Sequence, residues 1–375
     1  MRVKLEDVCE RGSSNIKQSD IIKMSGNYPI YGASGLAGKV NFYHQEQPYV
    51  AVVKDGAGIG RTTLNPAKSS VIGTMQYLIP KKNVLPEYLF YVVSYMHLEK
   101  YYTGATIPHI YFKDYKNKEF NLDNIEKQLE IIDVLGRCKK VIEARKQELV
   151  ELDSLTKARF VELFGDPVAN PMHWPVKRLK ELAIQINSGN TPKGGSENYV
   201  EKGITFFRSQ NVWKDRLEMD DIAYIDEKTH ESMKRSSLKH GDILMTKTGR
   251  INTENSSLGR AALYEGEDDM ANVNGHVYFI RLKEGVNNKF VLRVLVSPEY
   301  RDLIRSVCVG GIDKRQLNKE HIEEFPIIYP PSEMIDNYIE FVEQVNKSKF
   351  DTMTFAPIYA IINLYLHTYF YQGRR

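Results

Sequence analysis

Basic and amide side chains that could bind phosphates or base edges gather on turns of this 375-residue sequence. Arg and Lys can donate hydrogen bonds to guanine, and Asn and Gln can bind adenine, in the major groove of duplex DNA. Each of these side chains could equally be a solvated surface group. The candidate DNA-contacting residues are Lys54, Arg61, Thr62, Lys193, Arg208, Gln210, Asn211, Lys247, Thr248, Arg250, Lys314 and Arg315.

The glycine-rich stretch Gly56–Arg61 has some likeness to a nucleotide-binding loop. It lacks the Gly-Lys-[Ser/Thr] ending of a P-loop, and its surroundings are not a βαβ dinucleotide unit. Two readings remain open. The stretch could be a tight turn that brings Lys54, Arg61 and Thr62 to a DNA backbone, or a turn with a purely structural role.

No catalytic constellation is evident in the sequence. It contains no [Asp/Asn]-Pro-Pro-[Tyr/Phe] motif, which an amino-methyltransferase would need to hold its target base. The nine histidines have no metal-ligand spacing, so we expect no metal site. We therefore expect a non-enzymatic chain without a cofactor of its own. The net charge of +3 permits phosphate binding but does not indicate it.

The cysteine pattern and the C-terminal composition bear on location. Cys9, Cys138 and Cys308 are isolated, which suits a reducing cytoplasm. The stretch from Thr352 to Gly373 carries no formal charge and is long enough to span a bilayer. Polar residues interrupt it, so we expect a cytoplasmic protein without a membrane span.

The longest regular pattern predicts one helix over Glu126–Leu163, bounded by Asp123 as a cap and by Gly165 at its end. Such a helix would be roughly 55 Å long at about 1.5 Å per residue. Its narrow apolar seam requires a second helix alongside, and Ser332–Val345 supplies one. The predicted helix-packing residues are Ile131, Leu135, Cys138, Ile142, Leu149 and Leu152 with Ile335, Tyr338, Val342 and Val345.

The pattern of strands and turns before the long helix recurs after it, with a period of about 200 residues. This indicates a duplicated α+β domain followed each time by a helix. We predict a first domain over residues 1–121, a long spacer helix over 122–165, a second domain over 166–330, a short second spacer helix over 331–350 and an atypical apolar tail over 351–375.

Several stretches resemble the specificity subunits of type I restriction–modification systems. They are IPHIYFKDYKNKEFNLDNIEKQLEIIDVL, TKARFVELFGDP, HWPVKRLKELA and VGGIDKRQLNKEHIEEFPIIYPPSE, and they occur in the order that this family shows. The resemblance covers residues 1 to about 350. It implies two target-recognition domains of similar fold, related by a pseudo-two-fold repeat and separated by long helices that form an antiparallel coiled coil.

The resemblance also implies a function and partners. Each domain would read one half of a split site on double-stranded DNA, and two modification (methyltransferase) subunits and restriction/translocase subunits would assemble on this scaffold. S-adenosylmethionine, ATP and Mg²⁺ would belong to those partners.

The C-terminal tail departs from the family pattern. From Asp351 onward the sequence matches nothing in the first repeat, and the helical pattern fades near Phe350. The tail has the character of an out-of-frame or recombined end. An alternative therefore stays open: a coiled-coil scaffold, or a silent truncated specificity allele without DNA-directed activity.

Overall fold

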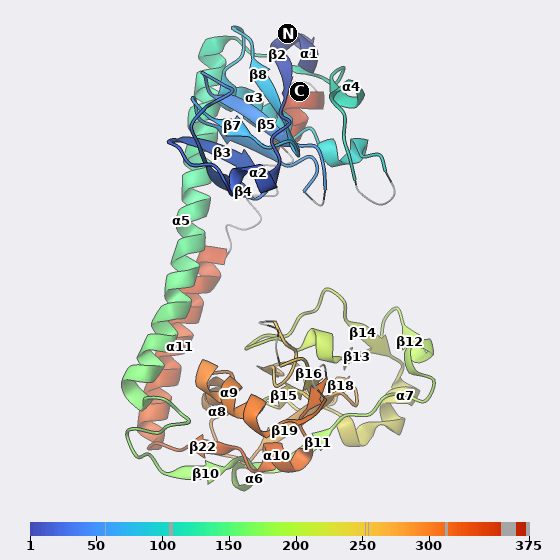
Figure 1. Cartoon of the computed structure of the whole chain (residues 1–375). Helices are drawn as coiled ribbons and strands as arrows, with labels where there is room; N and C mark the ends of the chain where they lie inside the picture. Colours follow the sequence, from blue (N-terminus) through green and yellow to red (C-terminus); the bar gives the residue numbers. More distant parts are fainter. Residues whose placement is uncertain are drawn as a thin grey trace. The chain divides into compact units, whose positions relative to one another are not determined.

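The structure, a computed structural model, describes the chain except for residues 57, 105–107, 252, 254, 312–313, 354–364 and 373–375. The described chain forms two compact units (Figure 1). Unit 1 comprises Met1–Leu149 with Phe350–Arg375, and unit 2 comprises Val150–Lys349. Both units mix short strands with helices, which confirms the predicted α+β class.

Unit 1 is built on a four-stranded antiparallel sheet with the order β2-β8-β5-β6. Every residue of β5 is buried, because its β-branched side chains pack on both faces of the sheet. A second sheet has the order β4-β3-β7, in which β3 and β7 are parallel. The strands are β2 (Cys9–Ser13), β3 (Tyr28–Gly32), β4 (Gly35–Val40), β5 (Tyr49–Val53), β6 (Thr62–Asn65), β7 (Ser70–Val71) and β8 (Met75–Pro80).

Helices and one further strand pair complete unit 1. Strand β1 pairs with β9 in antiparallel fashion and so joins the beginning of the chain to the residues just before the long helix. Helix α3 begins with Pro at its first position, where the missing N–H costs nothing. These elements are β1 (Arg2–Lys4), α1 (Leu5–Val8), α2 (Gln18–Ile21), α3 (Pro86–Ser94), α4 (Phe112–Tyr115) and β9 (Glu119–Asn121).

Unit 2 repeats this plan. Its central antiparallel sheet has the order β11-β19-β15-β17, and a second sheet has the order β12-β14-β13-β18 with β13 and β18 parallel. The strands of these two sheets, together with the separate pair β10 and β22, are β10 (Val176–Arg178), β11 (Ala183–Ser188), β12 (Tyr199–Val200), β13 (Ile204–Phe207), β14 (Ala223–Ile225), β15 (Ile243–Thr246), β17 (Ala261–Leu263), β18 (Ala271–Val273), β19 (Val277–Leu282) and β22 (Pro326–Ile328).

The correspondence between the units confirms the predicted internal repeat. The pair β10–β22 of unit 2 matches β1–β9 of unit 1, and the two central sheets have equivalent strand orders. Helix α6 follows β10 as α1 follows β1. The helices of unit 2 outside the spacer are α6 (Leu179–Leu182), α7 (Glu227–Ser232), α8 (Asn288–Leu295), α9 (Pro298–Val307) and α10 (Lys319–Glu323).

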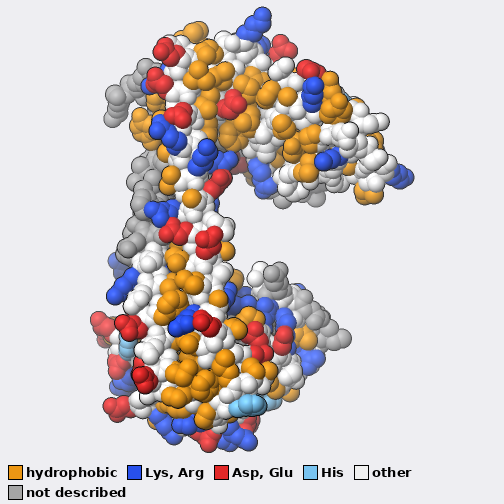
Figure 2. Space-filling view, turned by 90° about the vertical axis from the view of Figure 1, so that its left-hand side faces the viewer, with side chains coloured by type: hydrophobic (Ala, Val, Ile, Leu, Met, Phe, Trp, Pro, Cys, Tyr) orange, Lys and Arg blue, Asp and Glu red, His pale blue; other side chains and the backbone are white. Residues whose placement is uncertain are grey.

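The predicted long helix is α5, which runs from Ile125 to Phe164. Its exposed faces carry ion pairs one turn apart, such as Asp133 with Arg137 at 2.8 Å and Arg159 with Glu162 at 2.8 Å. Each such pair adds a few tenths of a kcal/mol to helix stability, about 0.2–0.5. Figure 2 shows positive, negative and apolar side chains interspersed on the visible face of the molecule.

Each end of α5 has an identifiable capping residue. The side chain of Asn124, rather than the predicted Asp123, accepts a hydrogen bond from the backbone N–H of Lys127 at 2.9 Å. Asp123 instead accepts hydrogen bonds from the hydroxyls of Tyr88 and Tyr369. At the other end Gly165 has a φ of 73°, a left-handed conformation that terminates helices and favours glycine.

In unit 2 the end of α5 packs against α11 (Ser332–Met353). Lys349 pairs with Asp153 at 2.6 Å, whereas the ring of Tyr338 meets those of Phe160 and Phe164. Residue numbers increase along α5 while those of the contacting residues on α11 decrease. The described parts of the two helices are therefore antiparallel, as expected.

The last described residues of the chain belong to unit 1. Residues 365–372 end in a short π-helical segment, Thr368–Gln372, drawn in red beside unit 1 in Figure 1. Leu366, Phe370 and Tyr371 are buried in the unit 1 core. The Asn121 side chain donates to the carbonyl of Tyr369 at 2.9 Å, and the Tyr371 hydroxyl donates to the carbonyl of Val92 at 2.5 Å. The rest of the predicted tail, 354–364 and 373–375, lies outside the described residues.

Among the helices that the structure describes, none combines the length and the apolar character needed to cross a bilayer.

Candidate nucleic-acid interface

A small three-stranded sheet in unit 2 brings five predicted contact residues together. Strand β21 (Arg315–Gln316) lies between β16 (Thr248–Gly249) and β20 (Val309–Gly310), with Gly249 and Gly310 both opposite Arg315. Residues separated by more than 60 positions in sequence therefore meet at one place. We call this set the β16–β21 cluster; it consists of Lys247, Thr248, Arg250, Lys314 and Arg315.

Two glycines allow these strands to approach their neighbours closely. A Cβ on Gly249 would lie 2.3 Å from the backbone nitrogen of Leu258, and one on Gly310 would lie 2.5 Å from the carbonyl oxygen of Lys314. Gly310 also has a φ of 122°, which side chains rarely adopt. The short sheet therefore requires glycine at both positions.

The charged members of the β16–β21 cluster differ in their surroundings. The ammonium of Lys247 lies 5.6 Å from the centre of the Tyr278 ring, and Arg315 donates to the carbonyl of Cys308 at 3.3 Å. The Nε of Arg315 is buried and has no hydrogen-bond partner among the residues that the structure describes. Arg250 and Lys314 are exposed, and neither joins an ion pair among the described residues. These two can reach an external anion without first breaking an internal bond.

The predicted residues Arg208, Gln210 and Asn211 converge on Asp221. Arg208 forms an ion pair with the Asp221 carboxylate at 3.1 Å, and the Gln210 amide donates to it at 3.0 Å. The Gln210 and Arg208 contacts lower the pKa of Asp221. Asn211 is buried and caps the turn by accepting from the backbone N–H of Arg208 at 3.0 Å. These contacts hold the turn in place. Lys193 is exposed and lies in a separate loop.

The remaining predicted contacts, Lys54, Arg61 and Thr62, lie on the glycine-rich turn of unit 1. Arg61 donates to the carbonyl of Ala33 at 2.9 Å, and the Thr62 hydroxyl donates to the carbonyl of Gly60 at 3.2 Å. Gly60 has a φ of 79° and lies against the backbone of Glu99. The described residues Gly60, Arg61 and Thr62 are thus held in place by these contacts, and Lys54 lies on the other side of the turn.

His109 belongs to the same region, although the residue pattern did not single it out. Its ring contacts the carboxylate of Asp55 and packs on the ring of Tyr111, with centroids 4.1 Å apart. Burial and the nearby Lys54 lower the pKa of His109. In the sequence, His109 is marked only by its position after Pro108 in the stretch that resembles the family. Its contact with Asp55 could not be predicted, because the two residues are 54 positions apart.

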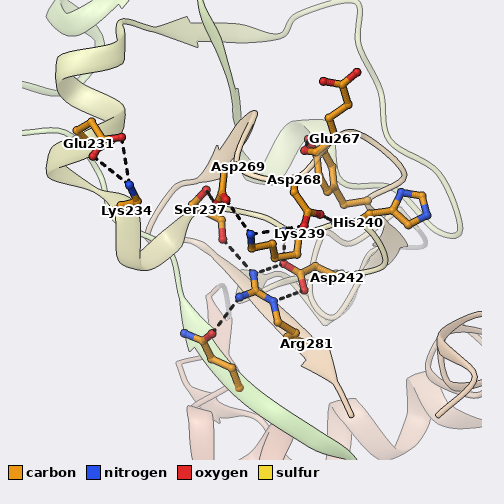
Figure 3. A network of polar contacts seen from close by, with 12 residues as sticks. Glu231, Lys234, Ser237, Lys239, His240, Asp242, Glu267, Asp268, Asp269 and Arg281 are labelled. Carbon is orange, nitrogen blue, oxygen red and sulfur yellow. Dashed lines mark hydrogen bonds and ion pairs between the residues drawn. The ribbon is translucent and has the colours of Figure 1, made fainter. Parts of the chain in front are cut away.

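The acidic stretch Glu265–Asp269 is partly neutralised within unit 2 (Figure 3). The Lys239 ammonium lies 2.7 Å from Asp269 and 3.5 Å from Asp268, and the backbone N–H of His240 donates to Asp268 at 2.7 Å. The contact with Lys239, followed by one with Ser237, lowers the pKa of Asp269. This network reduces the repulsion that the acidic stretch would exert on a nearby phosphate.

The predicted helix-packing residues divide between the units. Leu135 is buried and Ile131 half-buried in the unit 1 core, while Cys138 and Ile142 line a hollow beside His367. In unit 2, Ile335, Tyr338 and Val342 pack on the core, and Val345 is buried. Leu149 and Leu152 are half-buried.

The described residues contain no group of three or more His, Cys, Asp or Glu side chains that could hold a metal ion. Cys9 and Cys308 are buried and Cys138 is half-buried, and all three are free thiols. The turns that carry Arg250, Lys314 and Lys193 offer exposed positive charge, which suits binding of anions and base edges.

The family model of the type I restriction modification DNA specificity domain matches residues 1–153 and 171–354. The specificity subunit of the type I restriction enzyme MjaIX from Methanocaldococcus jannaschii is 26% identical over 287 residues, which cover 71% of this chain and 63% of that protein. The match thus spans less than two thirds of the relative's length.

Two solved structures share the fold. The S subunit of a type I restriction–modification system from M. genitalium aligns with a TM-score of 0.60 at 15% identity, covering 98% of this chain and 95% of that one. A chain from a study of complex assembly and conformational transition of the type I R-M system aligns with a TM-score of 0.51 at 15% identity, covering 98% and 94%. Because the family model matches most of its length, the chain belongs to the type I restriction modification DNA specificity domain family.

Proposed function

We propose that this chain is the non-catalytic, sequence-reading subunit of a type I restriction–modification complex. Each unit would contact one half of a bipartite site on double-stranded DNA. The observation that carries this proposal is the repeated α+β fold, in which each unit presents basic side chains on glycine-dependent turns. Two copies of one reading fold suit two half-sites on a duplex.

The partners would supply the chemistry. Modification subunits would transfer the methyl group from S-adenosylmethionine, and restriction/translocase subunits would use ATP and Mg²⁺. We place part of the docking surface for these partners on α5, which carries exposed apolar side chains along its length. They include Leu129, Val134, Val141, Val150 and Leu155. We place the assembly in the cytoplasm.

The decisive experiment compares the methylomes of a host that lacks the gene, a host that carries it and a host that carries it with its modification partners. We expect methylation at one split motif only when this chain and the partners are present together. Methylation at a continuous motif, or a pattern independent of this gene, would contradict the proposal.

A scaffold without DNA-directed activity is the second candidate, and the exposed apolar positions of α5 are the observation that favours it. The two candidates differ in salt dependence. A DNA reader releases counterions on binding, so its affinity for duplex DNA falls steeply as salt rises. A scaffold would assemble with its partners and show no such binding.

A further inference from the structure

A cavity of about 540 Å³ in unit 2 is surrounded by more positive than negative charge. Its lining includes three carboxylates, and each of them pairs with a cation of the same lining: Asp153 with Lys349, Asp215 with Arg293 and Asp302 with Arg305. The lining contains further cations, among them Lys157, Lys214 and Arg260. No ion pair of the described residues involves any of these three, so the cavity has an excess of positive charge.

The fixed part of this cavity is Arg260, which is only 8% exposed. Its guanidinium lies 3.9 Å from the centre of the Trp213 ring, and its Nε donates to the carbonyl of Ser256 at 3.0 Å. Its backbone is bound to Thr246 of the central sheet. Carbonyls and an aromatic face hold this cation in place without neutralising its charge, which leaves it available to an anion.

The other cations reach the cavity from separate elements. Lys157 projects from α5, Lys214 from the loop after Trp213, and Arg301 from α9, whose first residues also line the cavity. Partial burial and the neighbouring cations Arg301, Arg260, Arg305 and Lys157 lower the pKa of Lys214. Like charges crowd together here at a cost in stability, as in many binding sites.

One loop contacts both the cavity and the β16–β21 cluster. Ser256, Leu258 and Gly259 line the cavity, while the hydroxyl of the adjacent Ser257 donates to the carbonyl of Thr248 at 2.7 Å. Arg301 donates to the carbonyl of Thr253 in the same loop at 3.1 Å. An anion in the cavity would therefore be bound beside the strand that carries the candidate base readers.

We propose that this cavity, formed around Arg260, Lys214 and Lys157, binds a phosphate group of the DNA backbone. The assignment rests on the proposed function. Phosphate contacts fix the register of a protein on the duplex, and base contacts then read the sequence. In this division the cavity positions the duplex and the β16–β21 cluster reads it. A free nucleotide or inorganic phosphate carries the same anionic group, so the experiment must distinguish these ligands from the DNA backbone.

The test uses the full chain and a random-sequence duplex in anisotropy titrations over a range of salt. The double variant Lys157→Gln/Lys214→Gln should bind the duplex at least about fivefold more weakly near 0.1 M salt, and its salt slope should fall by about one, since one phosphate contact contributes about 0.9. The matched control is Lys202→Gln/Lys228→Gln, which removes two exposed charges of unit 2 outside the cavity. It should leave the slope unchanged, and Lys157→Arg/Lys214→Arg should retain binding.

Thermal melting separates binding from folding. Because the cavity cations repel one another, Lys214→Gln should melt at the same or a higher temperature than the wild type. Fluorescence of Trp213, one of two tryptophans, reports whether inorganic phosphate or ATP enters the cavity. We expect both to bind much more weakly than the duplex.

Three results would overturn the inference. If the wild type binds the duplex and the double variant has an equal salt slope, the cavity does not contact the backbone, although the proposed function stands. If the wild type binds no duplex, either alone or assembled with its modification subunits, the proposed function fails too; ATP binding that Lys214→Gln abolishes would then identify a free phosphate ligand. If the double variant loses only its association with a modification subunit, the cavity belongs to a protein interface.

Discussion

The ring of Phe370 meets the ring of Tyr88 edge-on in unit 1, with centroids 5.5 Å apart and planes at 89°. In unit 2 the ring of Phe164, at the end of α5, meets Phe290 of α8 in the same way, at 5.1 Å and 75°. Tyr88 lies on α3, the counterpart of α8. The described residues 365–372 thus occupy in unit 1 the place that the end of α5 occupies in unit 2.

This relationship predicts that the C-terminal segment stabilises unit 1. Phe370→Ala should lower the free energy of unfolding of unit 1 by about 3 kcal/mol, because it removes a fully buried aromatic side chain. Urea unfolding measures the loss. Tyr365→Ala is the control, since Tyr365 is 66% exposed in the same segment. Equal stability of the two variants would mean that the segment is not part of the unit 1 core.

The same segment should respond to pH. Burial, followed by the nearby His97, Lys118 and Lys100, lowers the pKa of His367 below its ordinary value of 6.5. A histidine with a lowered pKa favours the folded state while it is neutral, so this contribution is present above about pH 6.5 and is lost as pH falls through the folded-state pKa.

We therefore expect residues 365–372 to become more susceptible to proteolysis as the pH is lowered from 7.5 to 5.5. His367→Asn should remove most of this pH dependence. A cleavage rate that changes equally in the wild type and the variant would contradict the prediction.

The ion pair of Arg281 with Asp242 gives a second stability prediction (Figure 3). Arg281 donates to both carboxylate oxygens, at 2.9 and 2.7 Å, and the Asp242 side chain is only 1% exposed. Burial raises the pKa of Asp242, and Arg281 opposes this rise. Arg281→Gln leaves a buried carboxylate without its cation, so we expect a loss of about 3 kcal/mol in unfolding free energy at neutral pH.

The pH dependence of that variant checks the cause. Without Arg281 the pKa of Asp242 rises further, so the folded form favours the protonated acid and the loss should shrink as pH falls toward 4. The double variant Asp242→Asn/Arg281→Gln should recover part of the stability. A loss in Arg281→Gln that is constant from pH 8 to pH 4 would refute the assignment to the buried charge.

Two glycine substitutions should have opposite effects. A Cβ on Gly249 would meet the backbone of Leu258, whereas a Cβ on Gly136 in α5 meets nothing within 4 Å. Gly136→Ala should stabilise the chain by about 0.5–1 kcal/mol, because alanine favours a helix over glycine. Gly249→Ala should disturb the β16–β21 cluster and weaken duplex binding. Thermal melting and anisotropy measure the two effects, and a neutral Gly249→Ala would argue against the required close approach.

Arg250 should affect sequence selectivity more than overall affinity. It is exposed beside β16 and joins no ion pair among the described residues, so it can reach a base edge. Arg250→Ala should reduce discrimination at one base pair by about 1–3 kcal/mol. Methylome mapping of the reconstituted complex would show a relaxed position within the motif. Lys202→Ala is the control, and an unchanged motif with uniformly weaker methylation would assign Arg250 to the backbone instead.

The sequence by itself determined the long helix, the repeat and the resemblance to the family. Helical periodicity and caps act over a few residues, so Glu126–Leu163 was predicted within one residue of each observed end. The repeat was visible because equivalent strands carry similar apolar runs. Even here the local signal had a limit: Asp123 and Asn124 are both good caps, and Asp123 is drawn away by the hydroxyls of Tyr88 and Tyr369.

Only the tertiary structure decided which distant residues meet. Arg315 joins Thr248 and Gly249 through strand pairing, Arg208 and Gln210 meet Asp221 across a loop, and Lys157 and Lys214 share a cavity with Arg260. The C-terminal segment, which matches nothing in the first repeat as a sequence, contributes Phe370 to the core of unit 1. Burial depends on contacts between residues far apart in the chain, and no local pattern encodes those contacts.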